Sequence, residues 1–160
     1  MSKISIIMGS QSDLETVKEA VKVLREFKVS FEIRVLSAHR TPYELAEYVD
    51  AAFDKGTEVF IAAAGGAAAL AGVIAAHTIL PVIGIPIETS SLKGMDSLLS
   101  TVQMPGGVPV ASMAIGKAGA KNAALFALAI LGINDKLISA KLLRYKKQMR
   151  HQIKQTKIKL

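Results

Sequence analysis

Cysteine is absent from this sequence of 160 residues, and histidine occurs only three times, as His39, His77 and His151. Without cysteine there can be no disulfide, no thiolate nucleophile and no cysteine-based metal site. No two of the histidines stand at a metal-ligand spacing such as i, i+4. We therefore expect no metal site.

Apolar runs of the kind that enter membranes are also lacking. The N-terminal run ends at Met8 and is too short for a signal peptide. The long segment without charge, residues 59–87, is rich in alanine and interrupted by glycine and proline. Such a segment is more typical of a buried strand, a small-residue helix and a second buried strand than of a membrane span. We expect a cytoplasmic protein with no membrane partner.

Acidic residues are missing from the C-terminal segment. Nine basic residues follow from Lys136 onward, whereas the preceding part holds eleven basic and thirteen acidic residues, so the net charge of +7 divides into −2 and +9. We predict one α/β domain over residues 1–134 and a basic helical extension over residues 135–160. The extension could pack on a neighbouring subunit, bind nucleic acid weakly or be solvated, and solvation is the commonest fate of charge runs. We do not expect a nucleic-acid partner.

Strand and helix patterns alternate five times along the chain. The expected strands are residues 3–8, 31–36, 59–64, 81–85 and 108–115, and the expected helices are residues 12–27, 41–54, 67–78, 96–102 and 118–131. Their spacing suits right-handed βαβ crossovers. The sequence therefore predicts a three-layer αβα sandwich on a parallel sheet, followed by an extra C-terminal helix. Ser12 with Glu15, and Thr41 with Glu44, predict capping boxes at the first two helices.

The loop after the first expected strand, residues 9–13, has the composition of an anion site. Amides at a helix N-terminus attract anions, and Ser10 and Ser12 add hydroxyl groups. Asp13 would repel an anion, so it is better suited to accept hydrogen bonds from sugar hydroxyls. The loop matches neither a Walker loop nor a GxGxxG fingerprint. Ser12 could instead serve only as a helix cap.

The loop after the second expected strand, residues 37–41, lies at the same edge of the sheet, where ligands bind in such folds. Arg40 offers a permanent, forked donor for phosphate or carboxylate. Histidine is the side chain best suited to shuttle a proton at neutral pH, and His39 stands between this arginine and a helix start, which favours an acid/base role over a structural one. We expect His77 to end a helix and His151 to be solvated. After the third strand, the small residues 64–69 would let the backbone approach a ligand, or simply allow tight packing.

Five segments stand out as motifs: MGSQSD at 8–13, SAHRTP at 37–42, AGGAAA at 64–69, GMDSLLSTVQMPGGVPVA at 94–111 and IGKAGAKNAAL at 115–125. Together they resemble the N5-carboxyaminoimidazole ribonucleotide mutase (PurE) family. The likeness covers about Ile4 to Leu131, and SAHRTP combined with DSLLSTVQMP is highly specific.

The resemblance implies a flavodoxin-like, cofactor-free isomerase of purine biosynthesis that assembles as a homo-octamer and binds a ribonucleotide. In that family the N-bound carboxylate of the substrate is released as CO2 and recaptured at the C4 ring carbon. The implied proton carrier is His39. The implied substrate-binding residues are Ser10, Asp13 and Arg40, with Ser12, Ser37, Ala38 and Gly65 nearby.

Two positions bear on the branch of the family. Arg40 resembles the mutase branch (class I), because the related carboxylases that use CO2 directly typically have lysine there. The family pattern GGAAHLPG is broken, since Ala69 replaces its histidine and Ala71 its proline. Two alternatives therefore stay open: a direct aminoimidazole ribonucleotide carboxylase, and a non-catalytic nucleotide- or RNA-binding module that uses the basic segment.

Overall fold

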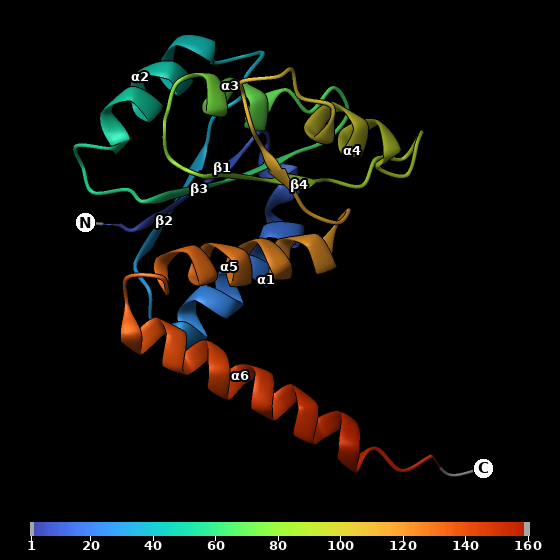
Figure 1. The fold of residues 1–160 in the computed structure, drawn as a ribbon. Helices are drawn as coiled ribbons and strands as arrows, with labels where there is room; N and C mark the ends of the chain where they lie inside the picture. Colours follow the sequence, from blue (N-terminus) through green and yellow to red (C-terminus); the bar gives the residue numbers. More distant parts are fainter. Residues whose placement is uncertain (1, 159–160) are drawn as a thin grey trace. The chain divides into compact units, whose positions relative to one another are not determined.

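A computed structural model of the chain describes residues 2–158 and contains a five-stranded parallel sheet (Figure 1). Its strands are β1 (Ile4–Met8), β2 (Phe31–Val35), β3 (Val59–Ala64), β4 (Val82–Pro86) and β5 (Ala111–Ser112). The strand order is β2-β1-β3-β4-β5, and every neighbouring pair is parallel. This order is the flavodoxin-like arrangement, which confirms the predicted fold class.

The helices that accompany the sheet follow the predicted alternation. They are α1 (Leu14–Phe27), α2 (Pro42–Ala52), α3 (Leu70–Ala76), α4 (Met95–Val102), α5 (Lys117–Leu131) and α6 (Lys136–Gln155). The chain forms two compact units, one that ends at Ala127 and one that begins at Leu128. In the first unit, α2, α3 and α4 cover one face of the sheet, while α1 and the N-terminal part of α5 cover the other (Figure 1).

The core of the first unit explains why these segments become strands. β1 and β4 are buried along their whole length, as expected for central parallel strands with helices on both faces. On one face, Ile7 and Phe60 pack with Leu45, Leu70 and Ile74. The edge strand β2 is instead partly exposed and carries charged residues.

Both predicted capping boxes are wrong in detail. A short 3-10 turn, Gln11–Asp13, precedes α1, so the capping residue is Ser10, two residues before the expected cap Ser12. Ser10 therefore caps the turn: its Oγ accepts from Ser12 N at 3.3 Å, and its own N–H donates to Asp13 Oδ2 at 3.2 Å. Thr41 precedes α2 but makes no side-chain cap bond. Its Oγ1 binds the backbone of Ser37 instead, accepting from the N–H at 2.8 Å.

Residues 59–87 form the predicted strand, helix and strand, as β3, α3 and β4. The helix is shorter than expected at both ends, since the chain enters α3 only at Leu70 and leaves it at Ala76. Within residues 2–158, none of the helices combines the length and the apolar character that crossing a membrane requires.

In the second unit, Asp135 caps α6 by accepting from Leu137 N at 2.9 Å and Ile138 N at 3.1 Å. This helix is the predicted extra C-terminal helix. The domain boundary after residue 134 stays a prediction.

Candidate active site

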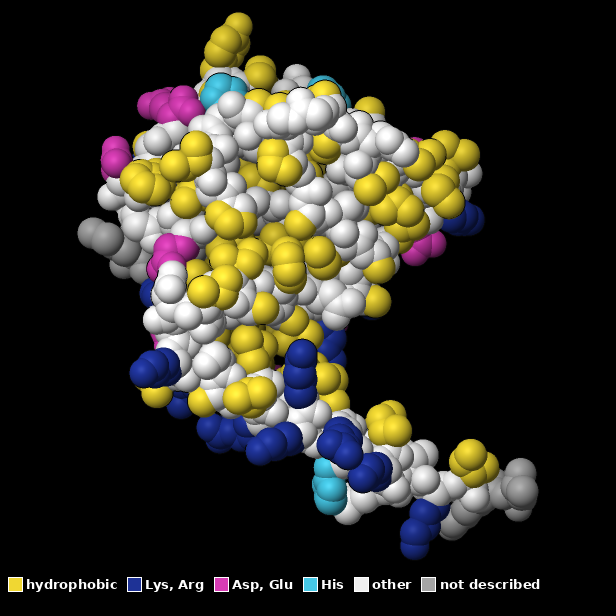
Figure 2. Space-filling view, viewed as in Figure 1, with side chains coloured by type: hydrophobic (Ala, Val, Ile, Leu, Met, Phe, Trp, Pro, Cys, Tyr) yellow, Lys and Arg dark blue, Asp and Glu magenta, His cyan; other side chains and the backbone are white. Residues whose placement is uncertain are grey.

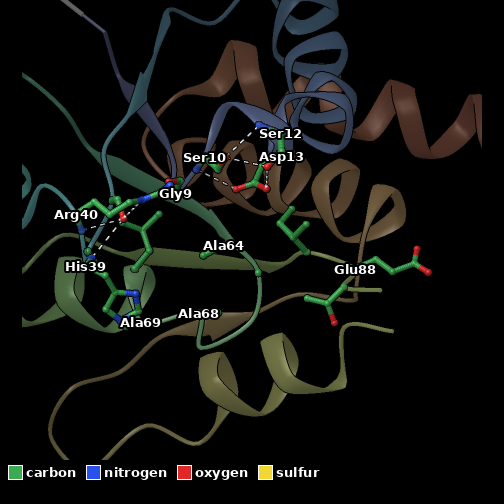
Figure 3. A pocket seen from close by; sticks show the side chains of 16 residues that line it. Gly9, Ser10, Ser12, Asp13, His39, Arg40, Ala64, Ala68, Ala69 and Glu88 are labelled. Atoms are coloured by element: carbon green, nitrogen blue, oxygen red, sulfur yellow. Dashed lines mark hydrogen bonds between the residues drawn. The ribbon is translucent and has the colours of Figure 1, made fainter. Parts of the chain in front are cut away.

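A pocket of about 540 Å³ opens at the carboxyl ends of β1 to β4, which is where the fold predicts a ligand site (Figure 3). The strands β1 and β3 lie side by side here, so the chain reverses its strand order at this point. The pocket is lined by Gly9, Ser10, Ser12, Asp13, Ser37, Ala38, His39, Arg40, Ala64, Gly65, Ala68, Ala69, Leu70, Ile87, Glu88 and Thr89. Four loops therefore share in building it.

All eight predicted site residues line this one pocket. They are Ser10, Ser12, Asp13, Ser37, Ala38, His39, Arg40 and Gly65. In Figure 3, Ser12 and Asp13 lie on one side of Gly9, while His39 and Arg40 lie on the other. The two loops thus face a shared cavity from different directions.

Asp13 is a carboxylate held at the base of the first loop, where only 7% of it is exposed. Burial raises its pKa above the ordinary value of 3.8, because a charged carboxylate loses solvation there. Contacts with Ser12, with the Ser10 N–H and with the positive charge of Arg40 act in the opposite direction, but more weakly. The carboxylate oxygens of Asp13 can still accept hydrogen bonds in the pocket, although burial disfavours the charged form.

Arg40 connects the second loop to the first. Its Nη2 donates to the carbonyl oxygen of Gly9 at 2.8 Å, and its Nε lies 3.4 Å from Ser37 Oγ. The same Ser37 oxygen is 3.3 Å from the backbone N of His39 and 3.2 Å from that of Arg40. Ser37 therefore shapes the turn that carries both residues. A guanidinium has five N–H donors, so Arg40 keeps donors for a ligand.

His39 is exposed, and among the described residues its ring has no hydrogen-bond partner. Figure 3 shows the ring on the side of the pocket formed by Ala68 and Ala69. A histidine in this setting is free to meet a ligand, because neither a carboxylate nor a backbone carbonyl holds it.

The loop after β3, residues 65–69, is held in place by Ser97, a fully buried residue of α4. Ser97 Oγ accepts from Gly66 N at 3.0 Å and donates to Ile87 O at 2.7 Å. The amide of Gly66 is therefore engaged within the protein. Its neighbour Gly65 lines the pocket.

Sequence reasoning missed Glu88 and Thr89. Both lie in the loop that follows β4, at the same edge of the sheet as the two loops that were singled out. The rule that ligands bind beyond the carboxyl ends of parallel strands could have identified them. Thr89 Oγ1 donates to Asp96 Oδ1 at 2.8 Å, which ties this loop to the start of α4.

The other two histidines lie elsewhere. His77 Nδ1 is 3.2 Å from Asp50 Oδ1, outside the pocket. His151 is exposed on α6. In the part of the chain that the structure describes, no three His, Asp or Glu side chains gather in a way that could hold a metal ion.

Comparisons with known proteins agree on one family. The model of the AIR carboxylase family matches residues 3–152. The N5-carboxyaminoimidazole ribonucleotide mutase of Pyrococcus abyssi is 57% identical over 94% of this chain and 85% of its own length. The enzyme of the same description from Saccharolobus solfataricus is 51% identical over 99% of both chains. The crystal structure of Treponema denticola PurE superimposes with a TM-score of 0.85 at 27% identity, covering 94% of this chain and 92% of that one.

Proposed function

The chain belongs to the AIR carboxylase family, and we propose on that basis that it is an isomerase of de novo purine biosynthesis. Its reaction converts N5-carboxyaminoimidazole ribonucleotide to 4-carboxy-5-aminoimidazole ribonucleotide by carboxylate transfer. The observation that carries the proposal is the single pocket in which hydroxyls, a buried carboxylate, a guanidinium and one imidazole meet. These groups match a phosphorylated sugar and a proton transfer.

The first loop and Arg40 would hold the ribonucleotide. The hydroxyls of Ser10 and Ser12 and the remaining donors of Arg40 can bind phosphate oxygens, since Arg suits them geometrically. Asp13 would accept hydrogen bonds from ribose hydroxyls, because its carboxylate has lone pairs and repels the phosphate. Ser37, Ala38 and Gly65 would shape the rest of the contact surface.

His39 would move the proton. In this isomerisation the bond between the exocyclic nitrogen and the carboxylate carbon breaks, and a bond from the C4 ring carbon to that carbon forms. C4 loses one proton and the nitrogen gains one, so the atoms balance without a co-reactant or a cofactor. One imidazole that accepts the first proton and delivers the second is therefore sufficient.

The alanine side chains that line the pocket suit the transient CO2. Ala64, Ala68 and Ala69 present only methyl groups, and Ala68 is 3% exposed. A substrate that closes over this wall would exclude water from the intermediate and favour recapture.

A substrate-preference assay tests the proposal. Purified protein is supplied either with N5-carboxyaminoimidazole ribonucleotide or with aminoimidazole ribonucleotide and bicarbonate. Turnover of the first substrate is the expected result, whereas turnover of the second alone would establish the direct carboxylase. The departure at Ala69 is what keeps that alternative worth testing.

We also propose that the chain works in the cytoplasm as a homo-octamer with no nucleic-acid partner. Family resemblance supports this proposal. Light scattering at micromolar concentration should then give the mass of eight chains of 17.0 kDa. A monomeric mass over the whole concentration range would exclude the octamer.

A further inference from the structure

Thr89 lines the active-site pocket, but the proposed mechanism gives it no role. It lies in the loop between β4 and α4. Figure 3 shows its neighbour Glu88 across the pocket from His39 and Arg40, so this loop approaches a ligand from the side opposite to the acid/base residue. The chemistry that Thr89 can offer there is set by its own contacts.

The hydroxyl of Thr89 has two partners among the residues that the structure describes. Its Oγ1 donates to Asp96 Oδ1 at 2.8 Å, with Asp96 Oδ2 at 3.1 Å, and it accepts from the N–H of Gly94 at 3.2 Å. These roles cannot be exchanged, because an ionised carboxylate only accepts and a backbone N–H only donates. The single hydroxyl hydrogen is used on Asp96, and one of the two lone pairs is used on Gly94. Toward a ligand, Thr89 can therefore only accept a hydrogen bond.

The backbone at Gly94 is tightly packed where the loop returns to Thr89. Gly94 is buried and has a φ of +87°. A Cβ at this position would lie 2.6 Å from Ile115 Cγ2 and 3.2 Å from Glu88 Cα. A buried N–H needs an acceptor, so Thr89 Oγ1 stays committed to Gly94 before any ligand arrives.

The helix α4 supplies the second partner, and its polar side chains face the pocket loops. Asp96, in the first turn, is half-buried and binds Thr89, while Ser97 holds the loop after β3. Hydrophobic side chains instead lie over the outer surface of α4 in Figure 2, where Met95, Leu99 and Val102 are exposed. Because its polar groups face inward, α4 has the character of a support for the pocket.

The methyl group of Thr89 indicates which part of a ligand the residue meets. Its Cγ2 lies 3.6 Å from the point that a Cβ on Gly65 would occupy, so Thr89 borders the small-residue segment after β3. The proposed mechanism places the transient CO2 against the alanine side chains of that segment, whereas it assigns the ribose hydroxyls to Asp13. Thr89 therefore lies beside the region of the base. In a neutral aminoimidazole base, N1 carries the ribose and N3 only accepts, so the exocyclic amine is the only N–H donor.

We propose that Thr89 Oγ1 accepts a hydrogen bond from the exocyclic amine of the substrate, and that Asp96 is the positioning residue that keeps Thr89 an acceptor. The inference rests on the proposed function, because it takes an aminoimidazole ribonucleotide as the ligand. The contact also selects the orientation of the ring. A ligand turned to place N3 or a carboxylate against Thr89 would bring two acceptors together, which is unfavourable.

Two ligands that differ only in the amine test the contact directly. Isothermal titration uses aminoimidazole ribonucleotide and the imidazole ribonucleotide that carries hydrogen in place of the amine. The unaltered protein should bind the amino ligand about tenfold more tightly, as expected for one hydrogen bond. Thr89→Val keeps the shape but loses the hydroxyl, so this ratio should fall to about one. Thr89→Ser is the matched control, because it keeps the hydroxyl and should keep the ratio. Thr89→Ala gives the same measurement if the valine variant does not fold.

Asp96 is tested through Thr89. In Asp96→Ala the hydroxyl hydrogen is free to turn toward the ligand, so the ratio should fall as it does in Thr89→Val. When Thr89 is already valine, Asp96→Ala should change the ratio no further. A purely structural role of Asp96 would weaken the binding of both ligands alike and leave the ratio unchanged.

The outcomes separate this inference from the proposed function. If neither ribonucleotide binds, the proposed function is wrong and the inference falls with it. If both bind with the same ratio in the unaltered protein and in Thr89→Val, the inference alone is wrong. Loss of the ratio in Thr89→Ser would assign it to the methyl group, and its survival in Asp96→Ala would remove Asp96 from the positioning role. Either result would overturn the proposal as stated.

Discussion

Arg40 Nη2 donates a hydrogen bond of 2.8 Å to the carbonyl oxygen of Gly9, and this contact joins the loop after β2 to the loop after β1. The same guanidinium reaches Ser37 with its Nε. The guanidinium of Arg40 therefore contacts both the loop after β1 and the loop after β2, and it helps to hold the two loops together.

Arg40→Lys should weaken substrate binding, because one ammonium group cannot reproduce the forked contact with Gly9 and Ser37. We expect KM to rise about tenfold, equivalent to about 1.4 kcal/mol, with a smaller effect on kcat. Steady-state kinetics measure both. Arg34→Lys is the matched control, since Arg34 lies on the exposed edge strand, and an equal effect there would refute this interpretation.

His39→Asn should remove the proton carrier while leaving the binding loops in place. We expect kcat to fall by about 10²–10⁴-fold with little change in substrate affinity, as is typical for the loss of a general acid/base group. Isothermal titration with the substrate and a turnover assay separate the two quantities. His77→Asn and His151→Asn should retain activity. Surviving turnover in His39→Asn would show that another group carries the proton.

Asp13→Asn should increase stability at neutral pH. The pKa of Asp13 is raised in the folded protein, so the folded state binds this proton more tightly than the unfolded state. The carboxylate therefore reduces the free energy of unfolding as pH rises from about 3.8 through the raised pKa. Urea unfolding of both proteins between pH 3 and 8 should show their difference growing with pH. A constant difference would contradict this expectation. The variant should also bind substrate less well.

Ser97→Ala should loosen the loop of residues 65–69. Ser97 is fully buried and bridges Gly66 and Ile87, so its removal leaves two backbone groups without their partner. We expect a loss of about 1–3 kcal/mol in the free energy of unfolding. Ser100→Ala is the control, because Ser100 is exposed and makes only a 3.5 Å contact with Gly66. Equal losses in the two variants would exclude a special role for Ser97.

The alternation of apolar runs and helix patterns was enough to predict the sheet, because each central strand is buried on both faces. The fifth strand is the exception. Residues 108–115 were expected, but only Ala111–Ser112 pair with β4. Pro109 has no N–H to donate, and Gly107 has a φ of +96°, so the chain before Ala111 cannot continue the ladder.

The candidate site could be predicted because topology places the loops after β1 and β2 together. The sequence could not choose between two overlapping capping patterns, Ser10 with Asp13 and Ser12 with Glu15. The 3-10 turn before α1 decides in favour of the first. Contacts across distant segments, such as Ser97 with Gly66, leave no local pattern to find.

The unconstrained ring of His39 has a chemical consequence. A histidine fixed by a carboxylate keeps one tautomer, and its reactive nitrogen always points to the same atom. The imidazole here can rotate and can carry its proton on either nitrogen, because no described residue holds it. In the mechanism that we propose, this single side chain would collect a proton at a ring carbon and release it at an exocyclic nitrogen, without a relay of further groups.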